Sequence, residues 1–144
     1  MKKIGSFILL LLAFQPMIGQ DFSEFEKTLR KHLAAIEEKN IADISATVSD
    51  SVTLIFPDGS MLKSKEKFME FHKKWFGDPS WKMAIQVVSA ENSDSLGYAL
   101  IKYRYEKSKE NEIQSVHHTY LLLIFKKIKG KWLLWHDQNT QMEK

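Results

Sequence analysis

The chain has 144 residues, which is the length of one globular domain with a single core. Hydrophobic residues make up 44% and charged residues 27%, proportions that exclude an intrinsically disordered protein. The formal net charge of +3 is small and the basic residues are scattered, so we expect no nucleic-acid partner.

Cysteine is absent from the sequence. Disulfides, thiolate nucleophiles and cysteine-ligated metals are therefore excluded, and so is a lipid anchor on an N-terminal cysteine. The hydrophobic core alone must stabilise the fold.

The N-terminal segment is typical of a cleavable secretory signal peptide. Two lysines follow Met1, residues 4–14 are almost all apolar, and Gly19 supplies a small residue before a cleavage site. The apolar run is too short to span a bilayer comfortably. We expect a signal peptide at 1–19 and one soluble domain at 20–144, released to the periplasm or secreted, with an uncleaved anchor as the alternative.

Three helices are predicted in the first half of this domain. Apolar residues recur at helical spacing over residues 22–39, which predicts a long amphipathic helix. A shorter helix is expected over residues 41–48. A third is expected over residues 65–75, with Ser64 as its N-cap.

Strands dominate the rest. A short β-branched strand is predicted at 52–56, before a turn at Pro57-Asp58-Gly59. Four longer strands follow, joined by short polar loops, at 81–90, 96–107, 114–127 and 131–140. Helices followed by a meander predict the α+β class with an antiparallel sheet.

Several of these strands are apolar on both faces, as over Tyr120–Phe125 and Trp132–Trp135. In an antiparallel sheet one face usually meets water. We therefore expect the helices to cover one face and a second copy of the chain to cover the outer face, giving a homodimer.

Three stretches resemble the nuclear transport factor 2-like superfamily, which includes ketosteroid isomerases, polyketide cyclases and uncharacterised exported domains. They are residues 40–51, Val52–Gly59, and Lys126–Trp132 leading into His136–Thr140. The resemblance implies a cystatin-like cone, in which three N-terminal helices pack in the concave face of a strongly bent antiparallel sheet. It also implies a pocket for a small apolar ligand at the open end of the cone, and a dimer on the outer face.

The ketosteroid isomerase chemistry lacks its base in this sequence. Phe56 stands where that subfamily places the proton-abstracting carboxylate, and a phenyl ring cannot accept a proton. The position of the oxyanion-donating tyrosine falls on His32 when the residues are counted back. His32 is therefore either a polar group in the pocket wall or a half-exposed histidine beside the core.

The remaining histidines form no recognisable metal motif. His117 and His118 are adjacent on a strand and point to opposite faces, so they cannot ligate one ion together. The uncharacterised branch usually carries a histidine, one residue and a serine on its last strand, where this chain has Gln138 and Thr140. His136, two residues earlier, is the candidate substitute. We expect no metal and no cofactor.

The sequence thus predicts an exported small-molecule-binding or accessory domain with an aromatic pocket at the mouth of the cone. The expected lining is His32, Phe56, Trp75, Tyr103, His118, Tyr120 and His136. One alternative is an isomerase-, cyclase- or hydrolase-like enzyme for a small apolar substrate, with His136 or His32 as its base. The other is a structural or interaction homodimer whose own side chains fill the pocket.

Overall fold

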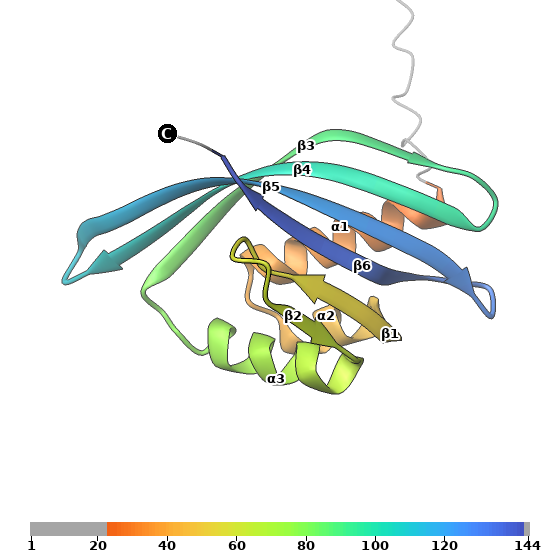
Figure 1. Ribbon diagram of the computed structural model, residues 1–144, viewed down its shortest axis with the longest axis horizontal. Helices are drawn as coiled ribbons and strands as arrows, with labels where there is room; N and C mark the ends of the chain where they lie inside the picture. The colour runs from red at the N-terminus through yellow and green to blue at the C-terminus, as the bar shows by residue number, and fades with distance from the viewer. Residues whose placement is uncertain (1–22, 143–144) are drawn as a thin grey trace, which may run out of the picture.

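The computed structural model describes residues 23–142, so the expected signal peptide at 1–19 lies outside the described residues. The helices are α1 (Glu24–Glu37), α2 (Ile41–Ala46) and α3 (Lys65–Phe76), and the strands are β1 (Val48–Ile55), β2 (Met61–Lys63), β3 (Trp81–Asn92), β4 (Leu96–Lys109), β5 (Glu112–Ile128) and β6 (Lys131–Gln141). This arrangement confirms the α+β class (Figure 1).

Local side-chain bonds explain where the two longer helices begin. Ser23 and Glu26 form a reciprocal capping box at the start of α1, in which each side chain accepts a hydrogen bond from the other's backbone nitrogen. The α3 helix begins after Ser64, whose hydroxyl accepts from the backbone nitrogen of Lys67. Both starts follow from the capping residues in the sequence.

The strands form one six-stranded sheet in the order β2-β1-β6-β5-β4-β3. The predicted antiparallel meander of β3, β4, β5 and β6 is confirmed. β1 pairs antiparallel with β2 but parallel with β6, so the sheet as a whole is mixed. The β1 strand starts earlier than predicted because Val48 already pairs with Leu134 of β6. For this reason α2 ends at Ala46 and does not reach residue 48.

The strands β3, β4 and β5 are long and sweep over the helices in a curve (Figure 1). Along these three strands the pairing register shifts between Val87 and Ser89, between Lys107 and Ser108, and between Ile124 and Phe125. An extra residue at such a bulge bends a strand and increases its twist. The bulges therefore help to give the sheet its concave face.

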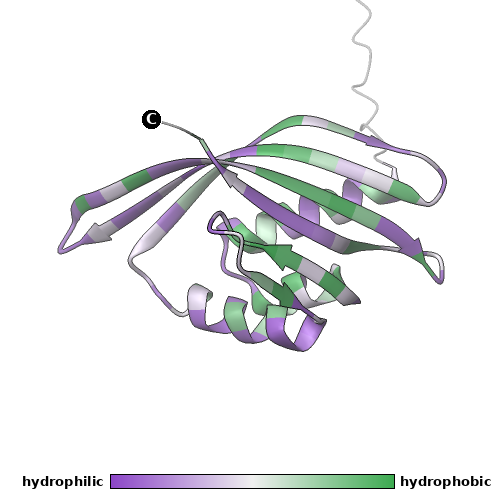
Figure 2. Ribbon diagram, in the orientation of Figure 1, coloured by the Kyte–Doolittle hydropathy of each residue, from purple (hydrophilic) through white to green (hydrophobic). Residues whose placement is uncertain are grey.

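The core lies between α1, α3 and this concave face. The Phe25 ring of α1 packs edge-on against Phe125 and Trp132, with ring centroids 5.7 Å and 5.3 Å away. Gly97 of β4 allows this close approach, because a Cβ there would lie 2.6 Å from the Phe25 ring. Figure 2 shows hydrophobic residues along the central stretches of β4 and β5.

The outer face of the sheet carries partly exposed aromatic side chains. Tyr98, Tyr120 and Trp135 are 36%, 38% and 36% exposed. The Lys126 ammonium lies 3.3 Å from the centroid of the Trp135 ring, in cation–π contact. Among the described helices, none has both the length and the apolar character that a membrane crossing requires.

Candidate functional site

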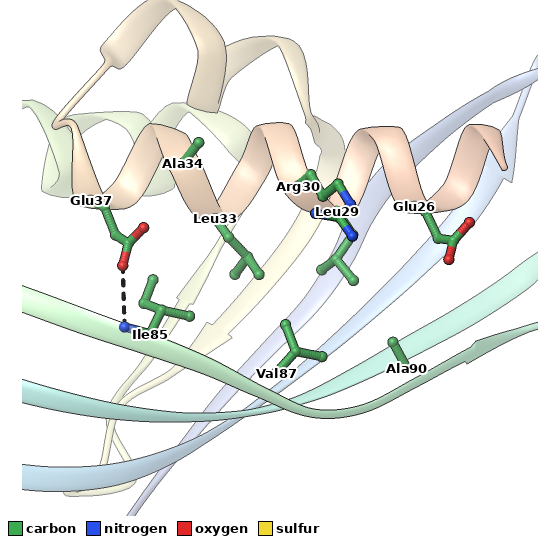
Figure 3. Close-up of a pocket in the computed structure, with 9 residues that line it drawn as sticks. All are labelled: Glu26, Leu29, Arg30, Leu33, Ala34, Glu37, Ile85, Val87 and Ala90. Atoms are coloured by element: carbon green, nitrogen blue, oxygen red, sulfur yellow. Dashed lines mark hydrogen bonds between the residues drawn. The ribbon is translucent and has the colours of Figure 1, made fainter. Parts of the chain in front are cut away.

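We compare two hollows as candidate sites. The first is a groove of about 450 Å³ between α1 and β3 (Figure 3). Leu29 and Leu33 of the helix face Ile85 and Val87 of the strand. The Glu37 carboxylate closes one end by accepting a hydrogen bond from the Ile85 backbone nitrogen at 3.2 Å. The floor is aliphatic, so the groove offers apolar surface with little directional chemistry.

The second hollow is a cavity of about 270 Å³ at the open end of the cone, which we call the mouth cavity. Its lining comes from α3, β4, β5, the end of β6 and the loop after β1, and consists of Pro57, Trp75, Tyr103, Tyr105, His117, Thr119 and Gln141. It combines large rings with several polar groups, which is the usual composition of a small-molecule site.

Stacked rings hold one wall of the mouth cavity in place. Trp75 stacks on Trp81 with centroids 4.4 Å apart and planes 13° apart, and Tyr105 stacks on Trp81 at 5.7 Å. The Trp81 indole nitrogen donates to the Trp75 carbonyl at 2.7 Å. The Lys39 ammonium lies 4.0 Å from the centroid of the Trp81 ring. Trp75 and Tyr105 are therefore preorganised.

A chain of hydrogen bonds lies behind the opposite wall. The Tyr103 hydroxyl donates to Asn139 Oδ1 at 3.0 Å. The Asn139 amide nitrogen donates to the Ile55 carbonyl at 3.2 Å and to Asp137 Oδ1 at 2.9 Å. Strand order explains the cluster, because β4, β5, β6 and β1 are consecutive neighbours in the sheet.

Asp137 supplies the carboxyl group of this network, and its pKa is strongly shifted. Its side chain is buried, and the residue is only 5% exposed. Burial raises the pKa of Asp137 to about 7, against the smaller lowering effect of the hydrogen bond from Asn139. Burial also raises the pKa of Tyr103, while hydrogen bonding with Thr119 lowers it. The neutral and ionised forms of Asp137 are therefore close in free energy near neutral pH.

Three of the seven predicted residues lie at or beside the mouth cavity. Trp75 and Tyr103 line it directly. Phe56 lines an adjoining shallow hollow that shares Pro57 and Gln141 with the cavity. The Phe56 ring is held edge-on against Phe71, with centroids 4.9 Å apart.

His32 is neither a pocket residue nor a half-exposed one, because it is completely buried in the core. Its Nδ1 lies 2.8 Å from the Thr47 hydroxyl, and its ring stands edge-on to Phe125. Its Nε2 has no hydrogen-bond partner within residues 23–142. Burial lowers the pKa of His32 to about 3, with a smaller contribution from the charge of His72. The His32 ring is therefore neutral near pH 7.

The other three predicted residues, His118, Tyr120 and His136, lie on the outer face, which corrects the expectation that they line the pocket. Thr119 and Leu121 are buried on the inner face, so the strand's alternation points His118 and Tyr120 outward. His136 pairs with the outward Ile124. His117 lines the mouth cavity in place of His118.

A bulge in β6 accounts for the error at His136. Ile124 pairs with His136 and the next residue, Phe125, pairs with Leu134, so Trp135 is an extra residue. The bulge shifts the alternation by one position and brings Asp137 to the interior. Regular alternation from the buried Leu134 would instead have placed His136 there, and no residue type in the sequence signals the bulge.

Thr119 and His117 share a face of β5 with the buried Leu121 and Leu123. Tyr120, Leu122 and Ile124 on the other face are also apolar, so alternation alone does not say which face is inner. Within residues 23–142, no three histidine or acidic side chains are grouped in a way that would hold a metal ion.

Solved structures share this architecture. A ketosteroid isomerase-like protein from Erwinia carotovora atroseptica superposes with a TM-score of 0.70 at 14% identity, over 88% of this chain and 99% of that one. A domain of unknown function with a cystatin-like fold from Nostoc punctiforme gives 0.71 at 17% identity, over 86% and 81%. An NTF2-like protein of unknown function from Pseudomonas putida gives 0.66 at 14% identity, over 81% and 83%. The fold is therefore the cystatin-like, NTF2-like cone.

Residues 26–141 match the SnoaL-like domain, and the chain belongs to this family. The match covers all nine helices and strands described in residues 23–142 except the first two residues of α1. No protein of curated function matches the chain in sequence.

Proposed function

We propose that the protein binds a small, largely apolar and planar molecule in the mouth cavity. One observation carries this proposal. The stacked wall of Trp75 and Tyr105 faces the same cavity as Tyr103, whose hydroxyl is fixed by Asn139. Flat apolar walls with a few oriented polar groups are what small-molecule recognition requires.

The size of the cavity limits the ligand. A volume of about 270 Å³ lies just below the range of roughly 300–1,000 Å³ that is common for ligand pockets. The adjoining hollow beside Phe56 and Asp58 extends the space toward solvent. A ligand of one or two fused rings with a polar substituent fits this geometry.

Binding is better supported than proton-transfer catalysis. His32 is sealed in the core and His136 is on the opposite face, so neither reaches a ligand in the mouth cavity. Asp137 has a perturbed pKa, but Asn139 and Tyr103 connect it to the cavity. An asparagine amide does not titrate and therefore does not pass a proton along this chain.

We also propose that the protein is exported and forms a homodimer. Export rests on the signal-peptide pattern of residues 1–19. Dimer formation is supported by the exposed rings of Tyr98, Tyr120 and Trp135 on the outer face of the sheet. Covering this face would remove apolar surface from water.

Titration calorimetry with 2-naphthol tests the binding proposal. Tyr105→Ala removes a ring from the cavity wall, whereas Tyr120→Ala removes the same ring from the outer face. We expect 2-naphthol to bind the wild type and the Tyr120→Ala protein alike, and the Tyr105→Ala protein about tenfold or more weakly. Equal binding to the two variants, or no binding to the wild type, would refute the proposal.

A further inference from the structure

The orientation of the Asn139 amide is set by its surroundings. The Ile55 carbonyl can only accept a hydrogen bond, and it lies 3.2 Å from one terminal atom of the Asn139 side chain. That atom must therefore be the nitrogen, which also donates to Asp137 Oδ1. The amide oxygen is left facing Tyr103.

This orientation decides the direction of the next bond. Because the Asn139 oxygen can only accept, the Tyr103 hydroxyl donates to it at 3.0 Å. A phenol carries a single O–H, so Tyr103 has no proton left to offer inside the cavity. What remains on the Tyr103 oxygen is acceptor capacity.

Thr119 is 3% exposed and lines the mouth cavity beside Tyr103. Its hydroxyl rotates and carries both donor and acceptor capacity, so the fixed direction in this wall comes from Tyr103.

We infer that the inner wall of the mouth cavity recognises a hydrogen-bond donor on the ligand, such as a phenolic O–H or an aromatic N–H. The Tyr103 proton goes to Asn139, so the Tyr103 oxygen can only accept a hydrogen bond from a ligand. A ligand that presents only a carbonyl or ether oxygen would meet lone pairs at Tyr103. This inference rests on the proposed binding function and names the chemical class that the site selects.

The other polar residues of the cavity do not provide this selectivity. His117 and Gln141 are exposed at the rim, and Tyr105 is half-buried. Each carries both donor and acceptor capacity, so none of the three rejects an acceptor ligand. Discrimination must therefore come from Tyr103, whose proton is already taken by Asn139.

Paired probes test the inference. The probe 2-naphthol carries an O–H, and 2-fluoronaphthalene has a similar shape without a donor. We expect the wild type to bind 2-naphthol about tenfold more tightly, as for one buried hydrogen bond. Tyr103→Phe should remove most of this difference. Tyr120→Phe is the matched control, because it deletes the same hydroxyl from the outer face of the sheet and should leave the difference intact.

A second variant reverses the polarity of the wall. Asn139→Leu removes the acceptor of the Tyr103 proton, which frees that proton for a ligand. We expect the affinity for the ketone 2-acetylnaphthalene to rise several-fold over the wild type, with a melting curve to confirm that the variant folds. Tyr103→Phe keeps the ring and tests the inference independently of whether Asn139→Leu folds.

The outcomes separate the two proposals. Equal wild-type affinity for 2-naphthol and 2-fluoronaphthalene would overturn the donor inference and leave the binding function standing. A preference that survives Tyr103→Phe would also overturn it. Absence of binding by every probe would overturn the binding function, and the inference with it.

Discussion

The Asn139 side-chain nitrogen lies 2.9 Å from a carboxyl oxygen of Asp137, two residues earlier on the same strand, and both residues face the interior. Residues two apart on a strand share a face, so this contact is local in sequence. Its effect reaches the cavity wall, because the contact helps to fix the Asn139 amide, and the Asn139 oxygen in turn accepts the Tyr103 proton.

Asp137→Asn should stabilise the protein at alkaline pH. The pKa of Asp137 is about 7 in the folded state and 3.8 as its ordinary value, so the folded state holds the proton more tightly. The contribution of Asp137 to the free energy of unfolding is therefore fully present below pH 3.8 and is lost as pH rises toward 7. The loss reaches roughly 4 kcal/mol above pH 7.

Urea unfolding of the wild type and Asp137→Asn at pH 5 and pH 8 measures this effect. The variant should gain stability relative to the wild type on going from pH 5 to pH 8. An equal pH response of the two proteins would show that Asp137 does not titrate abnormally.

His32→Phe should reduce acid sensitivity. Burial lowers the pKa of His32 to about 3 and that of His72 to about 4, from 6.5. Both are neutral when folded, so stability is complete above pH 6.5 and falls as pH drops below it. Below pH 6.5 each histidine lowers the free energy of unfolding by about 1.4 kcal/mol per pH unit. Asp137 has the opposite pH dependence and offsets the loss from one of the two histidines.

Melting temperatures measured at pH 7 and pH 5 test this prediction. The drop between the two pH values should be smaller for His32→Phe than for the wild type. His117→Phe, at the exposed rim of the mouth cavity, is the control and should keep the wild-type drop. A His32 variant with an undiminished drop would contradict the assignment.

Leu122→Lys should prevent dimer formation. Leu122 lies on the outer face of the central strand β5, between His118 and Ile124 on the same side. A lysine there places a charge in the middle of the proposed interface, where desolvation is unfavourable. Native mass spectrometry should show a wild-type dimer and a variant monomer. A monomeric wild type would refute the dimer.

Periodicity accounts for most of what the sequence predicted. The capped helices and long strands follow from apolar spacing and from serines such as Ser64. The parallel pairing of β1 with β6 joins distant segments, and no local pattern reveals it. The interior position of Asp137 depends on the bulge at Trp135, and the complete burial of His32 depends on packing against Phe125.

The aromatic content pointed to Trp75 and Tyr103, which do lie in one cavity. It did not separate them from Tyr120, because a strand that is apolar on both faces has no obvious inner side. Only the register of β5 with its neighbours assigns Tyr120 to the outer face.

The most direct test of the mouth cavity is an NMR measurement of nuclear Overhauser effects from 2-naphthol ring protons to methyl groups of the protein. Binding in the mouth cavity predicts contacts to the Thr119 methyl group. Contacts to Val87 or Leu33 in the groove between α1 and β3, or to Leu122 on the outer face, without any to Thr119, would contradict the assignment of the site.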